Sequence, residues 1–397
     1  MTMSSAPLFL PMNNVIQDYA WGSFNALDTL FGIPNTEGKP QAEIWMGAHP
    51  NGCSTVQFGK EEILLSDFIN ASPDTILGAR TLSEFGELPY LFKVLSAEKA
   101  LSVQVHPSKS QAEQGFTREN EAGIALNAAN RNYKDPNHKP ELVFALTPYQ
   151  AMNGFREISD IVTLFDALDL DIIGDIVEAL KATPTPEGLK AFFGALLSLE
   201  GETKDLAVSR LLAYATVNQQ DPLFALLMDL SEQYPGDIGL FAPLMLHVVT
   251  LQPGEAMFLD ACTPHAYIKG TGLEIMANSD NVLRAGLTPK YMDVPELVAN
   301  TLFEAKPANK VLLAPNEDGN AKHFAIPVPD FKFSVYEGNS DIDAESAEIL
   351  FSLDGDITLI GNNGETLTVA IGQSAFVPAT TGKYRVEATG RFARAYC

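Results

Sequence analysis

Polar and apolar side chains alternate in the stretch Leu101-Ser-Val-Gln-Val-His-Pro107. Because side chains alternate across a β-strand, Ser102, Gln104 and His106 are predicted to share one face of it. A hydroxyl, an amide and an imidazole in a row make a poor core but a suitable cavity wall, and a proline ends the strand just after the imidazole. We therefore predict that Gln104 and His106 form half of a zinc site. An edge strand with its polar face in water would show the same pattern, so the rest of the chain has to decide.

Length and composition indicate a globular protein of two or three domains: 397 residues, 46% hydrophobic and 19% charged. Fifty Asp and Glu against 26 Lys and Arg give a formal net charge of −24, which argues against a nucleic-acid or anionic-membrane partner. An anionic substrate would need a local cluster of Lys and Arg. Residues 1–12 lack a basic leader, so we expect no signal peptide. Three cysteines offer no disulfide framework, and we expect a reduced, cytoplasmic protein.

Periodicity divides the chain into three parts. Short β patterns and turn signals fill the first 155 residues, and from about Glu157 apolar residues recur at helical spacing. β character returns near 244–251, where a Pro-Gly turn leads to His265, as in a jelly-roll barrel whose mouth holds a metal. The hairpin signal Asn362-Asn-Gly364 marks a further β region.

We therefore expect a mainly β fold with a helical insertion, that is, two jelly-roll barrels and an all-α domain. The catalytic barrel is predicted to be discontinuous, over residues 1–155 and 236–306. The helical insertion is predicted over 156–235 and the C-terminal β domain over 307–397.

A glutamate opens the apolar strand expected at 142–146. Such a residue normally faces solvent, but Glu141 could instead neutralise part of the charge of a metal. Because the intervening proline favours an extended backbone, Lys139 and Glu141 are expected on one face. Cys262 lies three residues before His265 and would face the other side of a strand, so we exclude it as a ligand.

Charged residues are concentrated in two further places. Glu274, Asp280, Arg284 and Lys290 lie among small and apolar residues, although a solvated loop would carry such charges too. Lys93 interrupts an apolar strand; it is either a solvated residue or a residue that points into the same cavity as Gln104.

Taken together, these segments resemble the type I phosphomannose isomerases. The similarity is carried by the motifs Tyr19-Ala-Trp-Gly22, Ala42-Glu-Ile-Trp-Met-Gly47, Phe92-Lys-Val-Leu95, Gln104-Val-His-Pro107, Asn132-Tyr-Lys-Asp-Pro-Asn-His-Lys-Pro-Glu141, Pro264-His-Ala-Tyr267 and Arg284-Ala-Gly-Leu-Thr-Pro-Lys290. The helical insertion and the C-terminal domain match only in placement.

The resemblance implies a cupin-like enzyme that interconverts mannose 6-phosphate and fructose 6-phosphate, with one Zn²⁺ per chain. It implies the metal ligands Gln104, His106, Glu141 and His265. It places the essential arginine of the family on Arg284 and the substrate pocket on Trp21, Lys93, Ser102, Lys139, Tyr267, Glu274, Asp280 and Lys290.

The residue types suit this chemistry. Two imidazoles and one carboxylate leave zinc a Lewis acid that can polarise a sugar carbonyl, and Arg284 can stabilise the charge of an enediolate. Glu274 is our first candidate for the proton-shuttling base and Lys139 the second, while Asp280 is expected to orient Arg284. Phosphate contacts are predicted from Lys93, Ser102 and Lys290.

Two other functions use part of the same residue set. A jelly-roll oxygenase or oxidase would hold a metal on two His and one carboxylate, but a fourth ligand at Gln104 and a basic cluster argue against it. A catalytically silent sugar-phosphate-binding cupin would not need Arg284, Glu274 and Lys139 together. A fused nucleotidyltransferase is disfavoured because no Gly-rich phosphate loop is present. We expect a monomer whose partner is a small sugar phosphate.

Overall fold

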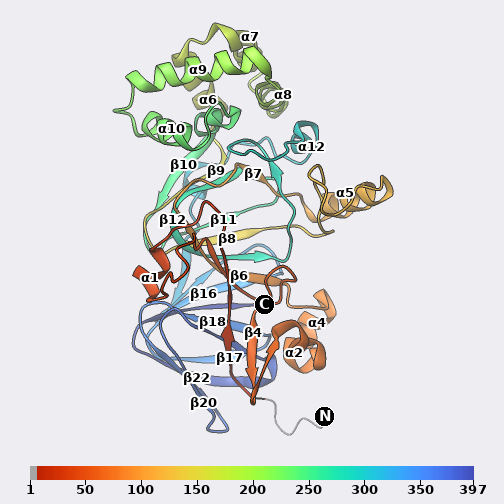
Figure 1. Cartoon of the computed structure of the whole chain (residues 1–397), viewed down its shortest axis with the longest axis vertical. Helices are drawn as coiled ribbons and strands as arrows, with labels where there is room; N and C mark the ends of the chain where they lie inside the picture. The colour runs from red at the N-terminus through yellow and green to blue at the C-terminus, as the bar shows by residue number, and fades with distance from the viewer. Residues whose placement is uncertain (1–6) are drawn as a thin grey trace.

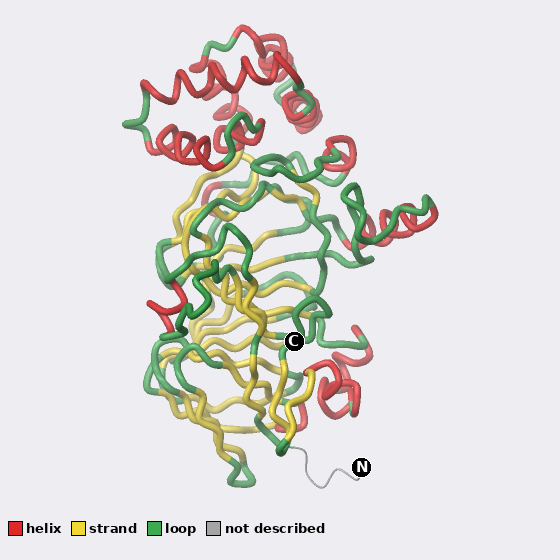
Figure 2. Tube along the Cα trace, in the orientation of Figure 1, coloured by secondary structure: helices red, strands yellow, loops and turns green. Residues whose placement is uncertain are grey.

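The computed structural model describes residues 7–397, which form an elongated molecule of three stacked parts (Figure 1). Helices gather at one end, a large sheet lies in the middle, and the C-terminal strands lie at the other end. Figure 2 shows the same division, with helices in red and strands in yellow. Residues 1–6, part of the segment for which we expect no signal peptide, lie outside the described residues.

A ten-stranded antiparallel sheet forms the middle part. Its main path runs in the order β10 (Leu246–Leu251), β9 (Tyr149–Phe155), β12 (His265–Ala277), β6 (Tyr90–Ala97), β3 (Glu43–Met46) and β2 (Val15–Gln17). The strands off this path are β7 (Gln104–Val105), β8 (Glu141–Ala145), β11 (Ala256–Leu259) and β13 (Leu283–Arg284). Strand β12 pairs with β6, β7, β8 and β9, so it brings four segments between residues 90 and 155 together.

The two faces of this sheet differ in character because side chains alternate along each strand. Phe92 and Val94 of β6 and Ile275 of β12 enter a hydrophobic core shared with the C-terminal strands. Lys93 and Glu274 are register partners on the opposite face and form an ion pair. The alternation predicted for β6 is confirmed, and its lysine is buried instead of solvated.

The C-terminal strands form two more antiparallel sheets. The nine-stranded sheet has the order β14 (Pro315–Asp318), β15 (Ala321–Phe324), β16 (Lys332–Glu337), β23 (Arg391–Tyr396), β18 (Glu348–Ser352), β21 (Ser374–Val377), β1 (Leu10–Asn13), β4 (Thr55–Phe58) and β5 (Glu61–Leu64). The four-stranded sheet has the order β17 (Ser340–Ala344), β22 (Gly382–Ala388), β19 (Ile357–Gly361) and β20 (Thr366–Val369). Because β1 pairs with both β21 and β4, the start of the chain and its C-terminal part share one sheet. The hairpin predicted at Asn362–Gly364 is confirmed between β19 and β20.

The predicted helical insertion is present at the far end of the molecule (Figure 1). Within the predicted range 156–235 lie α6 (Ile158–Leu168), η1 (Asp171–Ile173), α7 (Gly174–Ala182), α8 (Pro186–Leu197), α9 (Gly201–Val217) and α10 (Pro222–Gln233). The short helices η2 (Ile238–Phe241) and α11 (Ala242–Met245) follow and lead into β10. In α6 the predicted apolar stripe is buried at Ile161, Phe165 and Leu168.

Helices also occur where only β structure is expected. These are α1 (Ala26–Phe31), α2 (Leu65–Ala71), α3 (Pro73–Leu77), α4 (Ala79–Phe85) and α5 (Lys109–Glu121). Helix α5 projects from the body (Figure 1) and buries only Ala112, Gly115 and Glu119. Its sequence therefore lacks the apolar stripe from which a helix is predicted. Its sequence signal is the capping box of Ser108 and Gln111. The remaining helices are α12 (Val294–Ala299), η3 (Ala308–Lys310) and η4 (Ala379–Thr381).

Within residues 7–397, every helix is too short or too polar to cross a membrane.

Candidate functional site

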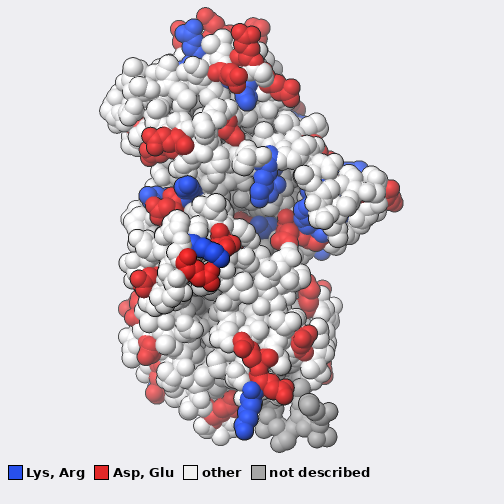
Figure 3. Space-filling model, in the orientation of Figure 1, with Lys and Arg blue, Asp and Glu red and all other residues white. Residues whose placement is uncertain are grey.

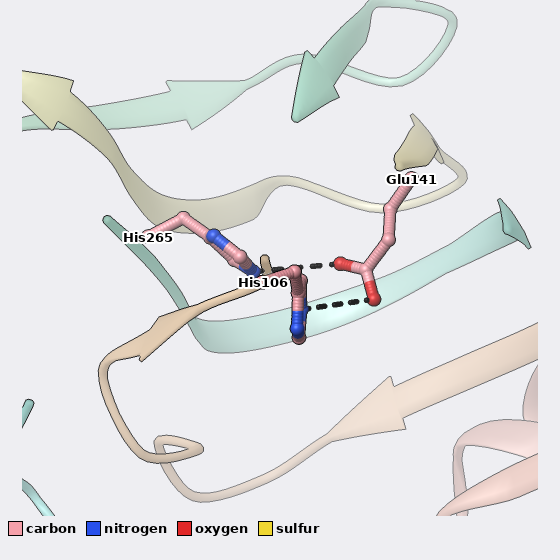
Figure 4. Close-up of side chains that lie close together, drawn as sticks. All are labelled: His106, Glu141 and His265. Atoms are coloured by element: carbon pink, nitrogen blue, oxygen red, sulfur yellow. Dashed lines mark ion pairs between the residues drawn. The ribbon is translucent and has the colours of Figure 1, made fainter. Parts of the chain in front are cut away.

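Three potential metal ligands converge where three strands begin or end. His106 follows β7 directly, while Glu141 and His265 open β8 and β12 (Figure 4). The Nε2 atom of His106 lies 3.4 Å from Oε1 of Glu141, and the Nε2 atom of His265 lies 3.5 Å from Oε2 of the same carboxylate. All three side chains are buried, and their ligand atoms lie within 4.8 Å of one another. A single cation can therefore be reached by all three.

The hydrogen bonds of the two imidazoles fit a metal. The Nδ1 atom of His106 lies 2.6 Å from the carbonyl of Asn281, and Nδ1 of His265 lies 2.9 Å from the carbonyl of Thr263. Because a carbonyl only accepts, both Nδ1 atoms carry the proton, and Nε2 is the ring atom of each imidazole that can bind a metal. The buried Nε2 of His106 has no hydrogen-bond partner. Burial and the nearby charge of Lys139 lower the pKa of His106 to about 4, so the ring stays neutral. Two imidazoles and a carboxylate are ordinary zinc ligands.

Asn281 is a buried hub behind the metal ligands. Besides its carbonyl bond to His106, its side chain accepts a hydrogen bond from the backbone N–H of Lys134 (2.6 Å) and donates to the carbonyls of Asp135 and Asn137 (2.8 Å each). The loop that leads into Glu141 is thus anchored to the residue that orients His106.

The fourth predicted ligand, Gln104, is the register partner of His265. On its other side its backbone is in register with Arg284, and its side chain lines the adjoining cavity. Among the described residues, its amide group has no hydrogen-bond partner.

Glu141 also has a cationic neighbour, Lys139, whose Nζ lies 3.0 Å from its Oε1. Burial by itself would raise the pKa of Glu141, but the charge of Lys139 outweighs it and holds this pKa well below its usual range. The carboxylate is therefore ionised, as a metal ligand must be.

A cavity of about 320 Å³ adjoins this cluster. Of the predicted site residues, the cavity is lined by Trp21, Lys93, Gln104, Lys139, Glu141, His265, Tyr267, Glu274, Asp280, Arg284 and Lys290. Figure 3 shows Lys and Arg side chains beside a hollow next to the projecting arm, on a face where acidic side chains are scattered. The structure thus brings together residues that span most of the chain.

Ser102 is placed differently from the expectation. It is half-buried and does not line the cavity, whereas Leu101 does. The reason is that β7 comprises only Gln104 and Val105, so the strand alternation does not extend back to residues 101–103. A phosphate contact from Ser102 stays a prediction.

Lys93 lies between two carboxylates. Its Nζ is 2.9 Å from Glu274 and 3.6 Å from Glu43. Burial alone would lower the pKa of Lys93, but these carboxylates raise it above its ordinary value. Its charge is therefore already neutralised by protein groups, and its predicted phosphate contact stays a prediction.

Glu274 is a buried carboxylate of the cavity wall. It accepts hydrogen bonds from Lys93 and from the hydroxyl of Tyr267 (2.8 Å). The same hydroxyl lies 3.2 Å from Glu141 and so links the two carboxylates. Burial raises the pKa of Glu274 in spite of the charge of Lys93.

Asp280 does not contact Arg284 in the described structure. Its Oδ1 lies 3.5 Å from Nε2 of His49, and its Oδ2 accepts from the side chain of Asn51 (2.8 Å). These partners come from the loop after β3, which sequence spacing alone did not associate with Asp280.

Arg284 and Lys290 are cations without carboxylate partners among residues 7–397. Arg284 is half-buried and Lys290 is exposed. Burial lowers the pKa of both side chains, and the charge of Arg284 lowers that of Lys290 further. Two cations without carboxylate partners at one cavity, in a chain of net charge −24, mark a place for an anion.

Two cavity residues, Glu43 and Tyr19, are absent from the sequence-based set. Glu43 is buried and accepts from the indole N–H of Trp45 (2.6 Å). Like Glu141, it opens an apolar strand within a quoted motif, and that signal could have identified it. Tyr19 stacks on Trp21 at a ring separation of 5.7 Å.

Comparisons with known proteins agree along the chain. Residues 9–158 match the catalytic domain of type I phosphomannose isomerase, residues 172–246 its helical insertion domain, and residues 320–397 the cupin domain of mannose-6-phosphate isomerase. The mannose-6-phosphate isomerase of Escherichia coli (strain K12) is 50% identical, with 96% of this chain and 98% of that protein covered. The enzyme of Homo sapiens is 37% identical, with 92% and 91% covered. A crystal structure of mannose 6-phosphate isomerase from Salmonella typhimurium, bound to its substrate fructose 6-phosphate and zinc, has a TM-score of 0.92 at 48% identity, with 98% and 99% covered.

Proposed function

This chain belongs to the type I phosphomannose isomerase family, and on that basis we propose how its cavity interconverts mannose 6-phosphate and fructose 6-phosphate. The enzyme is a zinc-dependent aldose–ketose isomerase. A proton leaves the carbon next to the sugar carbonyl and returns to the neighbouring carbon, through an enediolate. The residues of the cavity wall divide into groups that hold the metal, move the proton and bind the anion.

Zinc is proposed to be held by Gln104, His106, Glu141 and His265, one ion per chain. The observation that carries the proposal is the unpartnered, buried Nε2 of His106, aimed at Glu141 beside a second imidazole with the same tautomer. When bound, zinc supplies Lewis acidity that polarises the sugar carbonyl and hydroxyl oxygens.

Glu274 is proposed to move the proton between the two carbons. Its burial shifts its pKa towards neutrality, which suits a group that both accepts and returns a proton. Lys93 and Tyr267 fix its orientation through hydrogen bonds of 2.9 and 2.8 Å. Lys139 is the second candidate, because it reaches the same end of the cavity.

Arg284 and Lys290 are proposed to meet the negative charge of the substrate. Arg284 is in register with the ligand Gln104, so its guanidinium serves the reacting end, where the enediolate charge develops. Lys290 lies farther along the same loop and is proposed to hold the phosphate, whose binding energy positions the reacting carbons. Asp280, held by His49 and Asn51, gives that wall a fixed carboxylate.

For the architecture, we propose that both β regions are cupin-like jelly rolls. The unit boundaries remain those predicted: 1–155 with 236–306, 156–235, and 307–397. The match of residues 320–397 to a cupin domain supports the second barrel. A cytoplasmic location and a monomeric state stay predictions.

The decisive test is conversion of mannose 6-phosphate to fructose 6-phosphate by the purified chain, before chelation, after chelation, and after zinc is added back. We expect activity to disappear with the metal and to return with zinc. Binding of fructose 6-phosphate without turnover would instead indicate a silent binding protein. Oxygen consumption without isomerisation would indicate an oxygenase.

A further inference from the structure

Asp237 joins the helical part of the chain to the loop that carries the two unpaired cations. Its Oδ1 accepts hydrogen bonds from the backbone N–H groups of Gly239 (2.7 Å) and Leu287 (2.8 Å), and its Oδ2 accepts from the N–H of Thr288 (3.1 Å). The first bond caps η2. The other two reach residues 50 and 51 positions away, so one carboxylate anchors two distant segments.

The two segments also meet backbone to backbone. A Cβ added to Gly239 would lie 2.4 Å from the backbone nitrogen of Leu287, and one added to Gly286 would lie 2.4 Å from the Cα of Gly239. Only glycine fits at either position. Leu287 itself has φ of 51°, in the left-handed region that a leucine rarely adopts, and its side chain is fully buried. Such a conformation persists only where the surroundings hold it.

The loop held in this way carries Arg284 at its start and Lys290 at its end. Two backbone hydrogen bonds fix the residues after Arg284 to Val103. The N–H of Ala285 donates to the carbonyl of Val103 (2.8 Å), and the N–H of Val103 donates to the carbonyl of Gly286 (3.0 Å). The backbone N–H of Lys290 donates to the hydroxyl of Thr288 (3.1 Å). Thr288 is one of the residues that Asp237 binds, so the place of Lys290 depends on that carboxylate. Asp237 does not line the cavity.

We propose that Asp237 is a positioning residue that holds the loop 285–290, so that Lys290 stays at the end of the cavity that receives the phosphate, while Arg284 is held at the reacting end by the pairing of β13 with β7. The inference rests on the proposed function in assigning the end at Lys290 to the phosphate of the sugar. The anchor is needed because Arg284 and Lys290 have no carboxylate partner among the described residues and repel each other.

The test compares Asp237→Ala and Asp237→Asn with the unsubstituted, zinc-loaded full chain. For each protein, KM and kcat for mannose 6-phosphate, the inhibition constant of inorganic phosphate, and the zinc content are measured. For Asp237→Ala we expect KM and the inhibition constant to rise about ten-fold, with kcat changed less than about two-fold and zinc retained. Asp237→Asn keeps an oxygen for Gly239 and Leu287 but presents an amide N–H to Thr288, so a smaller rise is expected.

Asp221→Ala is the matched control. Asp221 caps α10 through the backbone N–H of Leu223 (2.9 Å), which is the same kind of bond as that of Asp237 to Gly239, but it has no bond to the loop 285–290. A purely structural role would make the two alanine variants alike: less stable, with KM unchanged. We expect only Asp237→Ala to weaken phosphate binding.

The proposal is overturned if phosphate inhibits Asp237→Ala as strongly as the unsubstituted chain, or if Asp221→Ala raises KM equally. If Asp237→Ala does not fold, Asp237→Asn decides, and an unchanged inhibition constant overturns the proposal. Failure of the proposed function is a separate result, because it would show as no turnover by the unsubstituted chain. In that case, calorimetric measurement of inorganic phosphate binding to Asp237→Ala and to the unsubstituted chain would still test the role of Asp237.

Discussion

The central sheet and the C-terminal sheet each bury a cluster of charged side chains, but the two clusters are completed differently. In the C-terminal part, the guanidinium of Arg394 binds both oxygens of Glu348, the hydroxyl of Tyr336 and the carbonyl of Asp343. The hydroxyl of Tyr384 donates to the same glutamate (2.8 Å). Every charged group of that cluster has its partners inside the protein.

In the central part, some polar and charged groups have no partner among the described residues. The Nε2 atom of His106 has no hydrogen-bond partner, and Arg284 has no carboxylate among the described residues. Buried groups without partners cost stability, so a fold keeps them only where something else supplies the partner. A closed cluster holds a fold together, whereas an open one receives a metal and a substrate.

The largest effect on activity is expected when one of the predicted metal ligands is replaced. His265→Ala should abolish both zinc binding and turnover, because one imidazole and its contribution to the site are lost. Zinc content and isomerase activity measure this. His247→Ala is the control: that imidazole, on β10, binds the carbonyl of Lys306 (2.7 Å) and should be dispensable for zinc. Full turnover by a zinc-free His265→Ala variant would refute the ligand set.

A smaller effect is expected from the unpaired guanidinium. Arg284→Ala should lower kcat by a factor of about 10²–10³, because a preorganised group at the developing charge is lost, while zinc content stays unchanged. Steady-state kinetics on metal-loaded protein measure this. Arg284→Lys should recover part of the loss, because it keeps the charge but not the planar fork. An alanine variant with normal kcat would remove Arg284 from the reacting end.

A still smaller effect is expected at Lys290. Lys290→Ala should raise KM about ten-fold with little change in kcat, because a remote contact to the phosphate is made equally in the ground and transition states. Lys322→Ala, in the C-terminal part, removes a lysine whose ion pair with Glu317 is exposed and should leave KM unchanged. An unaltered KM in Lys290→Ala would take this residue out of the phosphate site.

The closed cluster should affect the reaction least. Arg394→Met leaves the buried Glu348 without its cation and should lower the free energy of unfolding by about 3–5 kcal/mol, with kcat and zinc content kept. Chemical denaturation measures this loss. The double variant Arg394→Met, Glu348→Met should regain stability, since no uncompensated charge remains. A drop in kcat for folded Arg394→Met would end the distinction between the two clusters.

Local sequence patterns, together with the resemblance to the type I phosphomannose isomerases, predicted the chemistry. The motif around His106 gave two of the four predicted metal ligands, and the resemblance implied the other two. The alternation along β6 gave the face on which Lys93 lies, since a strand fixes the side of each side chain locally. The helical insertion and the hairpin at Asn363 followed from periodicity and turn residues. Helix α5 was not predicted, because a helix that buries few apolar side chains shows no apolar stripe in its sequence.

Only the tertiary structure decided which partner each charged group has. Lys93 is neutralised by Glu43 and Glu274, and Asp280 contacts His49 and Asn51, across 50 to over 200 residues of chain. Asp237 likewise reaches the cation-bearing loop from another part of the molecule. Such pairings depend on the register and packing of segments that local periodicity does not relate. The amino-acid sequence thus determined what this site is made of, and long-range packing determined which of its charges remain free to bind.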